Sequence, residues 1–503
     1  MTQHPPSGLS RKTQPVPEDG KPILSVFQGF SPLSPESSNP KAIQKVRKSA
    51  ISVLLIALIV LTSIFNFCAP VWAVENPKEL VLALYPYVPR LEQFQNSIQQ
   101  KWQEVEPNVK LKILSSEDWD GGYGKEPPEN VDVYVFDAIF LNYFKSKRLL
   151  LPLEKNEIEG KEDFLSYASE GVQFGDKFYA IPQLGCSNIL FYRDKDTSLK
   201  NATKLTDIYQ TIGQCSYTSK IPPDSRGLMI DMGGGTTNAC LYMDALASVK
   251  NQFPVPEPEN EQQVDPLAMD NLRTLLKMTS YDNATQQESY EAASWFSNGY
   301  GRAVVGFTES MSAMSPETLQ HIDFKVMPLS DNDKTALFYA DVIGIHPNVE
   351  QRGTRQLAVK LANLLASSEN MIDSIGAKEF GQPQYLMPAR HTVFSHLAKS
   401  YPNYQKMYDL VESANPILFT LDNNAKPWFT NMKNTLTKMV RANYTCGCDY
   451  GDGQIWNQEE ANRKCPNICT QYGGWNGEWR TTEPNKKSVC GCNSCSISAA
   501  PLP

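Results

Sequence analysis

The sequence predicts an α/β fold in which two lobes enclose a cleft, followed by a cysteine-rich tail. From about residue 77, strand-like and helix-like segments alternate, which is typical of α/β architecture with largely parallel sheets. The stretch from residue 77 to about residue 440 is too long for one compact sheet, which indicates two lobes. Seven of the 11 cysteines lie between residues 446 and 503, in a stretch with little apolar periodicity.

The expected elements begin with a buried strand over residues 80–84 and an amphipathic helix over residues 90–104. Strands over 109–114 and 131–137 come next, and a helix over 138–148 follows them directly. Farther along the chain, the pattern predicts helices near 263–280 and 353–366 and strands near 302–308, 324–329 and 337–345. Sheets of this kind bind ligands at the carboxyl ends of their strands, where we expect the cleft.

The run Asp231-Met-Gly-Gly-Gly-Thr236 resembles the phosphate loop of actin-like ATPases. The second phosphate loop and the adenosine motif that accompany it in those enzymes are absent from the sequence. We therefore expect a tight loop before a helix at this position and no bound nucleotide.

The N-terminal part of the chain has the pattern of an export segment. Residues 1–48 are polar and rich in Pro, Ser and Gln, and are expected to be a disordered leader. Residues 49–73 are apolar, follow four basic residues between 41 and 48, and end on Val71-Trp72-Ala73, which predicts cleavage after Ala73. The length also allows a membrane-spanning anchor. In both cases the body of the protein lies outside the cytoplasm, either secreted or periplasmic, or anchored with its catalytic domain outside.

The tail, over residues 439–503, is rich in Gly, Asn and Trp, so covalent links must replace an extended core. Its cysteines are Cys446, Cys448, Cys465, Cys469, Cys490, Cys492 and Cys495. Their spacing fits either disulfides or zinc ligation, and export into an oxidising space favours disulfides.

Composition excludes several other classes of protein. With 47 Lys and Arg against 55 Asp and Glu, the net charge of −8 argues against nucleic-acid binding, which needs a surplus of cationic groups. None of the five histidines stands four residues from another, so a histidine-based catalytic metal site is not expected. We expect no metal and no bound cofactor. A membrane would be contacted only through an uncleaved N-terminal segment.

Polar and aromatic residues follow several of the expected strands. Tyr85 and Tyr87 follow the first strand, Asp137 ends another, Glu309 follows the strand near 302–308, and Asp341 interrupts an apolar run. Each of these alone is also explained as a capping residue or a half-buried aromatic. Together they predict a polar cleft at the strand ends.

Cys186 is the candidate nucleophile, because it is remote from the tail and stands between two strand-like pieces, directly after Gly185. Glycine lets a ligand approach the backbone closely. A reactive thiol needs a lowered pKa or an adjacent base, and with no histidine nearby in the sequence a carboxylate is the leading candidate. The alternatives are a buried structural cysteine and one half of a disulfide. Cys215 and Cys240 are expected to pair with each other.

The segment Pro182-Gln-Leu-Gly-Cys-Ser-Asn-Ile-Leu-Phe-Tyr-Arg193 resembles the nucleophile segment of type I thiaminase (thiamine pyridinylase). The resemblance runs from about residue 77 to about 435. It also takes in Tyr85-Pro-Tyr87, Val133-Tyr-Val-Phe-Asp137, residues 227–238 and Gly306-Phe-Thr-Glu-Ser-Met311. It implies a fold like that of periplasmic solute-binding proteins, with two α/β lobes around a cleft, over residues 74–438.

The resemblance also implies the role of each matched residue. Cys186 matches the nucleophile that attacks the pyrimidine ring of thiamine, and Glu309 matches the carboxylate that takes the thiol proton. Asp137 and Asp341 match the acids that hold the aminopyrimidine. The aromatic lining of the cleft is matched by Tyr85, Tyr87, Tyr123, Tyr290 and Tyr339. Phe307 departs from the family pattern, where a tyrosine is expected, and this change removes one hydrogen bond to the substrate.

The sequence therefore predicts a secreted, monomeric transferase that degrades thiamine. The enzyme would replace the thiazole with an organic base or thiol through a covalent cysteine–pyrimidine intermediate. The alternative is a non-enzymatic extracytoplasmic solute-binding protein for thiamine, a pyrimidine or a sugar. Cys186 together with Glu309 separates the two, since a protein that only binds its ligand has no use for a nucleophile.

Overall fold

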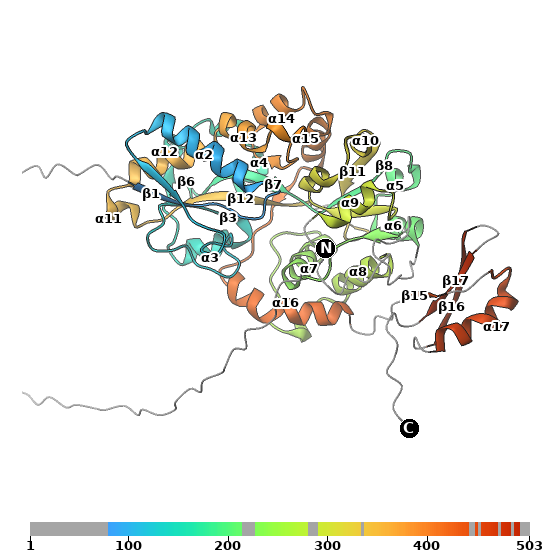
Figure 1. The fold of residues 1–503 in the computed structure, drawn as a ribbon. Helices are drawn as coiled ribbons and strands as arrows, with labels where there is room; N and C mark the ends of the chain where they lie inside the picture. The colour runs from blue at the N-terminus through green and yellow to red at the C-terminus, as the bar shows by residue number, and fades with distance from the viewer. Residues whose placement is uncertain are drawn as a thin grey trace, which may run out of the picture. The chain divides into compact units, whose positions relative to one another are not determined.

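A computed structural model describes residues 79–213, 227–279, 290–332, 336–441, 448–450, 454–470, 474–483 and 487–492 (Figure 1). The predicted leader and the apolar segment 49–73 lie outside these residues. None of the helices in the described part of the chain combines the length and apolar character that crossing a membrane requires.

The first lobe is built on a seven-stranded sheet with the order β13-β7-β12-β3-β1-β2, to which β14 adds beside β12. Its strands are β1 (Glu79–Ala83), β2 (Lys110–Ile113), β3 (Val133–Asp137), β7 (Ile181–Cys186), β12 (Leu337–Ile345), β13 (Met387–Pro388) and β14 (Ile417–Leu418). Strand β3 is buried over its whole length, which explains its unbroken apolar run before Asp137. Helix α12 packs against β3, β7 and β12 (Figure 1).

The second lobe has a four-stranded sheet with the order β11-β8-β10-β9. Its strands are β8 (Ile189–Arg193), β9 (Leu228–Met229), β10 (Ala303–Gly306) and β11 (Ile322–Val326). The predicted strand at 324–329 is thus shifted toward the N-terminus. Strand β11 ends before Pro328, which has no N–H group to donate to a neighbouring strand.

The prediction of largely parallel sheets is wrong, because both sheets are mixed. Strand β1 pairs in parallel with β2 and β3, whereas β12 runs antiparallel to both β3 and β7. Strands β7 and β12 belong to segments that pass between the lobes. They are therefore not joined to their neighbours by the right-handed crossover connections that make adjacent strands parallel.

Two of the passages between the lobes lie close together. Only Ser187 and Asn188 separate β7 of the first sheet from β8 of the second. The chain returns between the end of β11 at Val326 and the start of β12 at Leu337, and the Ser187 hydroxyl donates to the Leu337 carbonyl at 3.1 Å. The residue that follows Cys186 is therefore tied to the start of β12.

The principal helices, in chain order, are α2 (Leu91–Val105), α3 (Leu141–Ser146), α4 (Ser166–Gly171), α5 (Thr197–Asn201), α6 (Leu205–Ile212), α7 (Gly235–Lys250), α8 (Pro266–Lys277), α9 (Glu291–Ser297), α10 (Pro316–Gln320), α11 (Val349–Arg352), α12 (Arg355–Ala366), α13 (Ser368–Ile375), α14 (His391–Leu397), α15 (Pro402–Ala414) and α16 (Ala425–Arg441). The helix expected at 138–148 is α3, preceded by a 3₁₀ turn over Ala138–Phe140. Helix α16 contacts α3 of the first lobe as well as α7 and α8 of the second. A small sheet of β4 (Leu153–Glu154), β5 (Gln173–Phe174) and β6 (Lys177–Phe178) completes the described part of the lobes.

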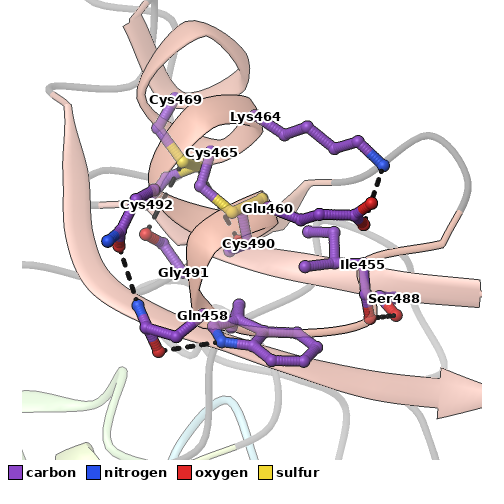
Figure 2. The surroundings of a disulfide bond; sticks show 12 residues. Ile455, Gln458, Glu460, Lys464, Cys465, Cys469, Ser488, Cys490, Gly491 and Cys492 are labelled. Carbon is purple, nitrogen blue, oxygen red and sulfur yellow. Dashed lines mark hydrogen bonds and ion pairs between the residues drawn. A yellow bond between two sulfur atoms is a disulfide. The ribbon is translucent and has the colours of Figure 1, made fainter.

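The tail forms a unit with its own small core. Helix α17 (Gln458–Cys469) lies on a three-stranded sheet of β15 (Cys448–Tyr450), β16 (Trp475–Glu483) and β17 (Lys487–Cys492). Disulfides Cys465–Cys490 and Cys469–Cys492 link α17 to β17 (Figure 2). The predicted disulfides are confirmed for these four cysteines, whereas the sulfur atoms of Cys446, Cys448 and Cys495 lie outside the described residues. Ile455, Ala461 and the four linked cysteines are the buried apolar residues of this core.

Candidate active site

A cavity of about 310 Å³ brings the predicted site residues together. All nine contribute to its lining: Tyr85, Tyr87, Tyr123, Asp137, Cys186, Tyr290, Glu309, Tyr339 and Asp341. They come from both lobes and from segments far apart in the sequence. The volume is within the lower part of the range of small-molecule sites.

Strand pairing in the first lobe places four of these side chains. Cys186 is the last residue of β7 and stands opposite Tyr339 on β12. Two residues farther along β12, Asp341 stands opposite Asp137, the last residue of β3. Because side chains of directly opposed residues lie on the same face of a sheet, each pair points to the same side.

The second lobe supplies the carboxyl group of Glu309. Strand β10 ends at Gly306, and Glu309 follows in the 3₁₀ segment Thr308–Ala313. Its side chain is 6% exposed, and its Oε2 atom has no hydrogen-bond partner among the described residues. A buried carboxyl oxygen without a hydrogen-bond partner, on a residue that lines a cavity, can take up a transferred proton.

Burial shifts the pKa of each of these acids upward. The pKa of Asp137 rises to about 6 and that of Glu309 to about 7, in both cases because the buried charge loses its hydration. Burial also raises the pKa of Asp341, and the nearby Asp137 and Glu309 raise it further. The pKa of the Cys186 thiol is raised by burial and then by Glu309 and Asp341. At neutral pH, the Cys186 thiol is protonated and Glu309 is near the midpoint of its titration.

Hydrogen bonds distinguish Asp137 from Asp341. The Tyr123 hydroxyl donates to Asp137 Oδ2 at 2.6 Å, and the Ile139 N–H donates to Oδ1 at 3.0 Å. Both donors favour the ionised form of Asp137. Asp341, with its more strongly raised pKa, is the acid that holds a proton when the two share the cavity.

Aromatic rings form much of the remaining wall. Tyr87 lies edge-on to both Tyr85 and Tyr123, with ring centroids 5.4 and 5.9 Å apart, and Phe307 lies 6.1 Å from Tyr339. Tyr87 is 55% exposed and Phe307 38% exposed, so these two rings reach toward solvent. Aromatic faces in this arrangement attract organic cations.

Sequence reasoning missed three other lining residues, Asn188, Cys240 and Asp231. The Asn188 amide donates to Asp244 Oδ2 at 2.9 Å and to the Tyr339 hydroxyl at 3.4 Å, which holds Tyr339 beside Cys186. Asn188 stands two residues after Cys186, and that proximity was the available signal. Cys240 and Asp231 belong to α7 and the loop before it, for which the sequence predicted local structure only.

The predicted pairing of Cys215 with Cys240 is wrong. Cys240 carries a free thiol that faces the cavity, as does Cys186. Helix α7 is buried on most sides, so its rotation is set by packing that a cysteine count does not capture. Cys215 itself lies outside the described residues.

The described part of the chain contains no group of three His, Cys, Asp or Glu side chains suited to a metal ion. The lining instead supplies a thiol, a carboxyl with a pKa near neutrality, and a pair of carboxyls suited to a flat heterocycle. This set can perform nucleophilic chemistry assisted by a general base.

Comparisons with known proteins agree with this geometry. The Thiaminase-1 domain family matches residues 187–330, and the Mannan-binding protein family matches residues 458–492. Thiaminase-1 of Paenibacillus thiaminolyticus is 35% identical over 370 residues, which cover 72% of this chain and 88% of that protein. The structure of Clostridium botulinum thiaminase I in complex with thiamin matches with 34% identity and a TM-score of 0.68, over 72% of this chain and 100% of that one.

A more distant match concerns the fold alone. An ABC transporter solute-binding protein from Thermotoga lettingae, bound with α-D-tagatose, is 16% identical with a TM-score of 0.50, over 72% of this chain and 93% of that one. The predicted two-lobed α/β fold is thereby confirmed.

Proposed function

The chain belongs to the thiaminase I family, and on this premise we propose that it cleaves thiamine by exchanging the thiazole for another base or thiol. The observation that carries the proposal is that the Cys186 thiol and the buried Glu309 carboxyl, whose Oε2 has no hydrogen-bond partner among the described residues, line one cavity. Thiamine offers this pair an electrophilic pyrimidine and a cationic leaving group.

The proposed first step joins the Cys186 sulfur to C6 of the pyrimidine. Glu309 takes the thiol proton, and the sulfur electron pair forms the C–S bond. Electrons of the ring then break the bond between the bridging methylene and the thiazolium nitrogen, and the thiazole leaves as a neutral molecule with that electron pair. A pKa of about 7 lets Glu309 accept the proton and later release it near neutral pH.

The second step restores the enzyme. A base such as pyridine adds to the exposed methylene carbon without losing a proton, whereas a thiol adds with loss of its proton to solvent. The ring regains aromaticity as the C–S bond breaks, and Cys186 leaves as a thiolate that takes back from Glu309 the proton transferred in the first step. No redox cofactor is required, because the electron count of substrate and product is unchanged.

Asp137 and Asp341 are proposed to hold the aminopyrimidine. Asp137, kept ionised by the Tyr123 hydroxyl, would accept a hydrogen bond from the exocyclic amino group. Asp341, which retains a proton, would donate to a ring nitrogen. Such preplaced groups stabilise the charge that develops in the ring, an effect worth several kcal/mol in a site without water.

Export remains part of the proposal. The two disulfides of the tail are typical of proteins that fold in an oxidising compartment, and this supports an extracytoplasmic location. We likewise propose that the leader, the export segment, the two-lobed domain and the tail are divided at residues 48, 73 and 438, and that the protein is a monomer.

The direct test is incubation of residues 74–503 with thiamine and pyridine, followed by mass analysis. We expect the pyrimidine–methylene unit to appear joined to pyridine, with free thiazole in equal amount. Omitting pyridine serves as the control for hydrolysis by water. Stable thiamine in every mixture, with thiamine bound, would support the non-enzymatic alternative.

The match to the Mannan-binding protein family supports a second function for the tail. We propose that residues 458–492 attach the enzyme to mannose-containing polysaccharides. Trp456, next to this segment, is 61% exposed, and flat aromatic surfaces of this kind stack on sugar rings. The disulfides hold α17 and β17 rigid, which lowers the entropy lost on binding.

Passage over mannan-coupled resin tests the tail. We expect residues 74–503 to be retained and eluted by soluble mannan, and residues 74–441 to pass through with thiamine-degrading activity intact. Trp456→Ala should lower the affinity for mannan by ~5–10-fold, which corresponds to a loss of about 1–1.5 kcal/mol of binding free energy. Equal passage of the long and short forms would contradict carbohydrate binding.

A further inference from the structure

The cavity is lined by more carboxyl groups than the proposed reaction uses. Four carboxyl groups line it, those of Asp137, Asp231, Glu309 and Asp341. Among the lining residues that the structure describes, none is Lys, Arg or His. The proposed mechanism employs three of these acids, and Asp231 remains without a role.

Asp231 lies in the glycine-rich loop that precedes helix α7. Its Oδ1 atom accepts a hydrogen bond from the Gly233 N–H at 2.9 Å. Thr236 and Thr237, in the first turn of α7, line the same cavity. The positive end of a 16-residue helix therefore lies at the cavity wall, with a protein carboxyl beside it.

This arrangement has a consequence for phosphate. A glycine-rich loop at a helix N-terminus ordinarily binds phosphate, because its free N–H groups and the helix dipole favour an anion. Here the Asp231 carboxyl takes one of those N–H groups and places a further acid beside the helix N-terminus, and the cationic group that interacts with it, Arg441, is not part of the cavity lining. Glu309 adds a further acid to the lining of the same cavity.

We infer that the site accepts thiamine in its unphosphorylated, cationic form and excludes thiamine phosphate esters, and that Asp231 is a specificity-determining residue for this choice. The inference rests on the proposed function. The thiazolium cation offsets the carboxyl charges, whereas a phosphate ester brings a dianion into a cavity that offers it no cationic side chain in the described lining.

The test compares thiamine with thiamine monophosphate, with pyridine as the second substrate and the purified full-length chain as the enzyme. We expect kcat/KM for the monophosphate to be lower by ~10²-fold or more. In Asp231→Asn, the ratio of monophosphate to thiamine kcat/KM should rise by at least ~10-fold, mainly through KM. The asparagine keeps an oxygen for the Gly233 N–H, so that the loop is retained.

Asp176→Asn is the matched control, because it removes the same charge at an exposed position outside the cavity lining. This control variant should leave the ratio of monophosphate to thiamine kcat/KM unchanged. Equal kcat/KM for both compounds in the native chain, or an unchanged ratio in Asp231→Asn, would overturn the inference.

Calorimetric titration of both compounds into Cys186→Ser separates this inference from the proposed reaction. Preferential binding of thiamine over the monophosphate would support the inference if the preference weakens when Asp231→Asn is added. This holds even if the native chain never consumes thiamine, because that result would reject only the proposed function. Equal binding of both compounds overturns the inference while leaving turnover of thiamine as a separate result.

Discussion

Thiamine consumption by Cys186→Ser is expected to fall by ~10³-fold or more, while the affinity for thiamine stays within a few-fold of the native value. Serine is close to cysteine in size, so the cavity keeps its shape. Its hydroxyl is a far weaker acid than a thiol, so a carboxylate with a pKa of about 7 generates the nucleophile from it far less readily. Loss of turnover with retained binding separates a chemical role for Cys186 from a structural one.

The measurement combines steady-state turnover with calorimetric binding, and Cys240→Ser serves as the matched control. Cys240 is the other free thiol in the described part of the cavity, and the proposed mechanism assigns it no step. We expect that variant to retain activity within ~3-fold, because the change preserves volume and removes no proposed bond. Native turnover in Cys186→Ser would show that the nucleophile lies elsewhere.

The second large effect is expected for Glu309→Gln, which should lower kcat by ~10²–10⁴-fold, the range typical of losing a general base. The amide preserves the shape of the side chain but cannot accept the thiol proton. Because burial raises the pKa of Glu309 to about 7 from an ordinary value of 4.5, the native enzyme should lose kcat/KM as the pH falls below about 7. An unburied glutamate would retain activity to a pH more than two units lower.

The residual activity of Glu309→Gln should show a much weaker dependence on pH in this range. The matched control is Glu257→Gln, since burial also raises the pKa of Glu257, to about 8, in a carboxyl that lines a different cavity. Glu257 Oε1 accepts a hydrogen bond from the Asp422 N–H at 2.6 Å, and this replacement should leave the pH profile of thiamine turnover unchanged. An acidic limb that survives in Glu309→Gln would assign the base to another residue.

Strong local patterns predicted several elements closely. The apolar runs before Ala83 and Asp137 are β1 and β3, and the strand expected at 337–345 is β12. Such strands are buried on both faces, so hydrophobicity alone marks their bounds. Hydrophobicity could not predict the direction of the strands, because a buried strand has the same composition whether its neighbours run parallel or antiparallel.

The sequence by itself determined which residues are equipped for chemistry, because a thiol after glycine and acids at strand ends are visible in the chain, and the family resemblance joined them. Only the tertiary structure decided which of them share one cavity and what their charges become there. The register between β7, β12 and β3 places Cys186 opposite Tyr339 and Asp137 opposite Asp341. The second lobe contributes Glu309, Cys240 and Asp231 to the same cavity. The pKa of a carboxyl follows from the water it loses and the charges it meets, and both are set by residues remote from it in the sequence.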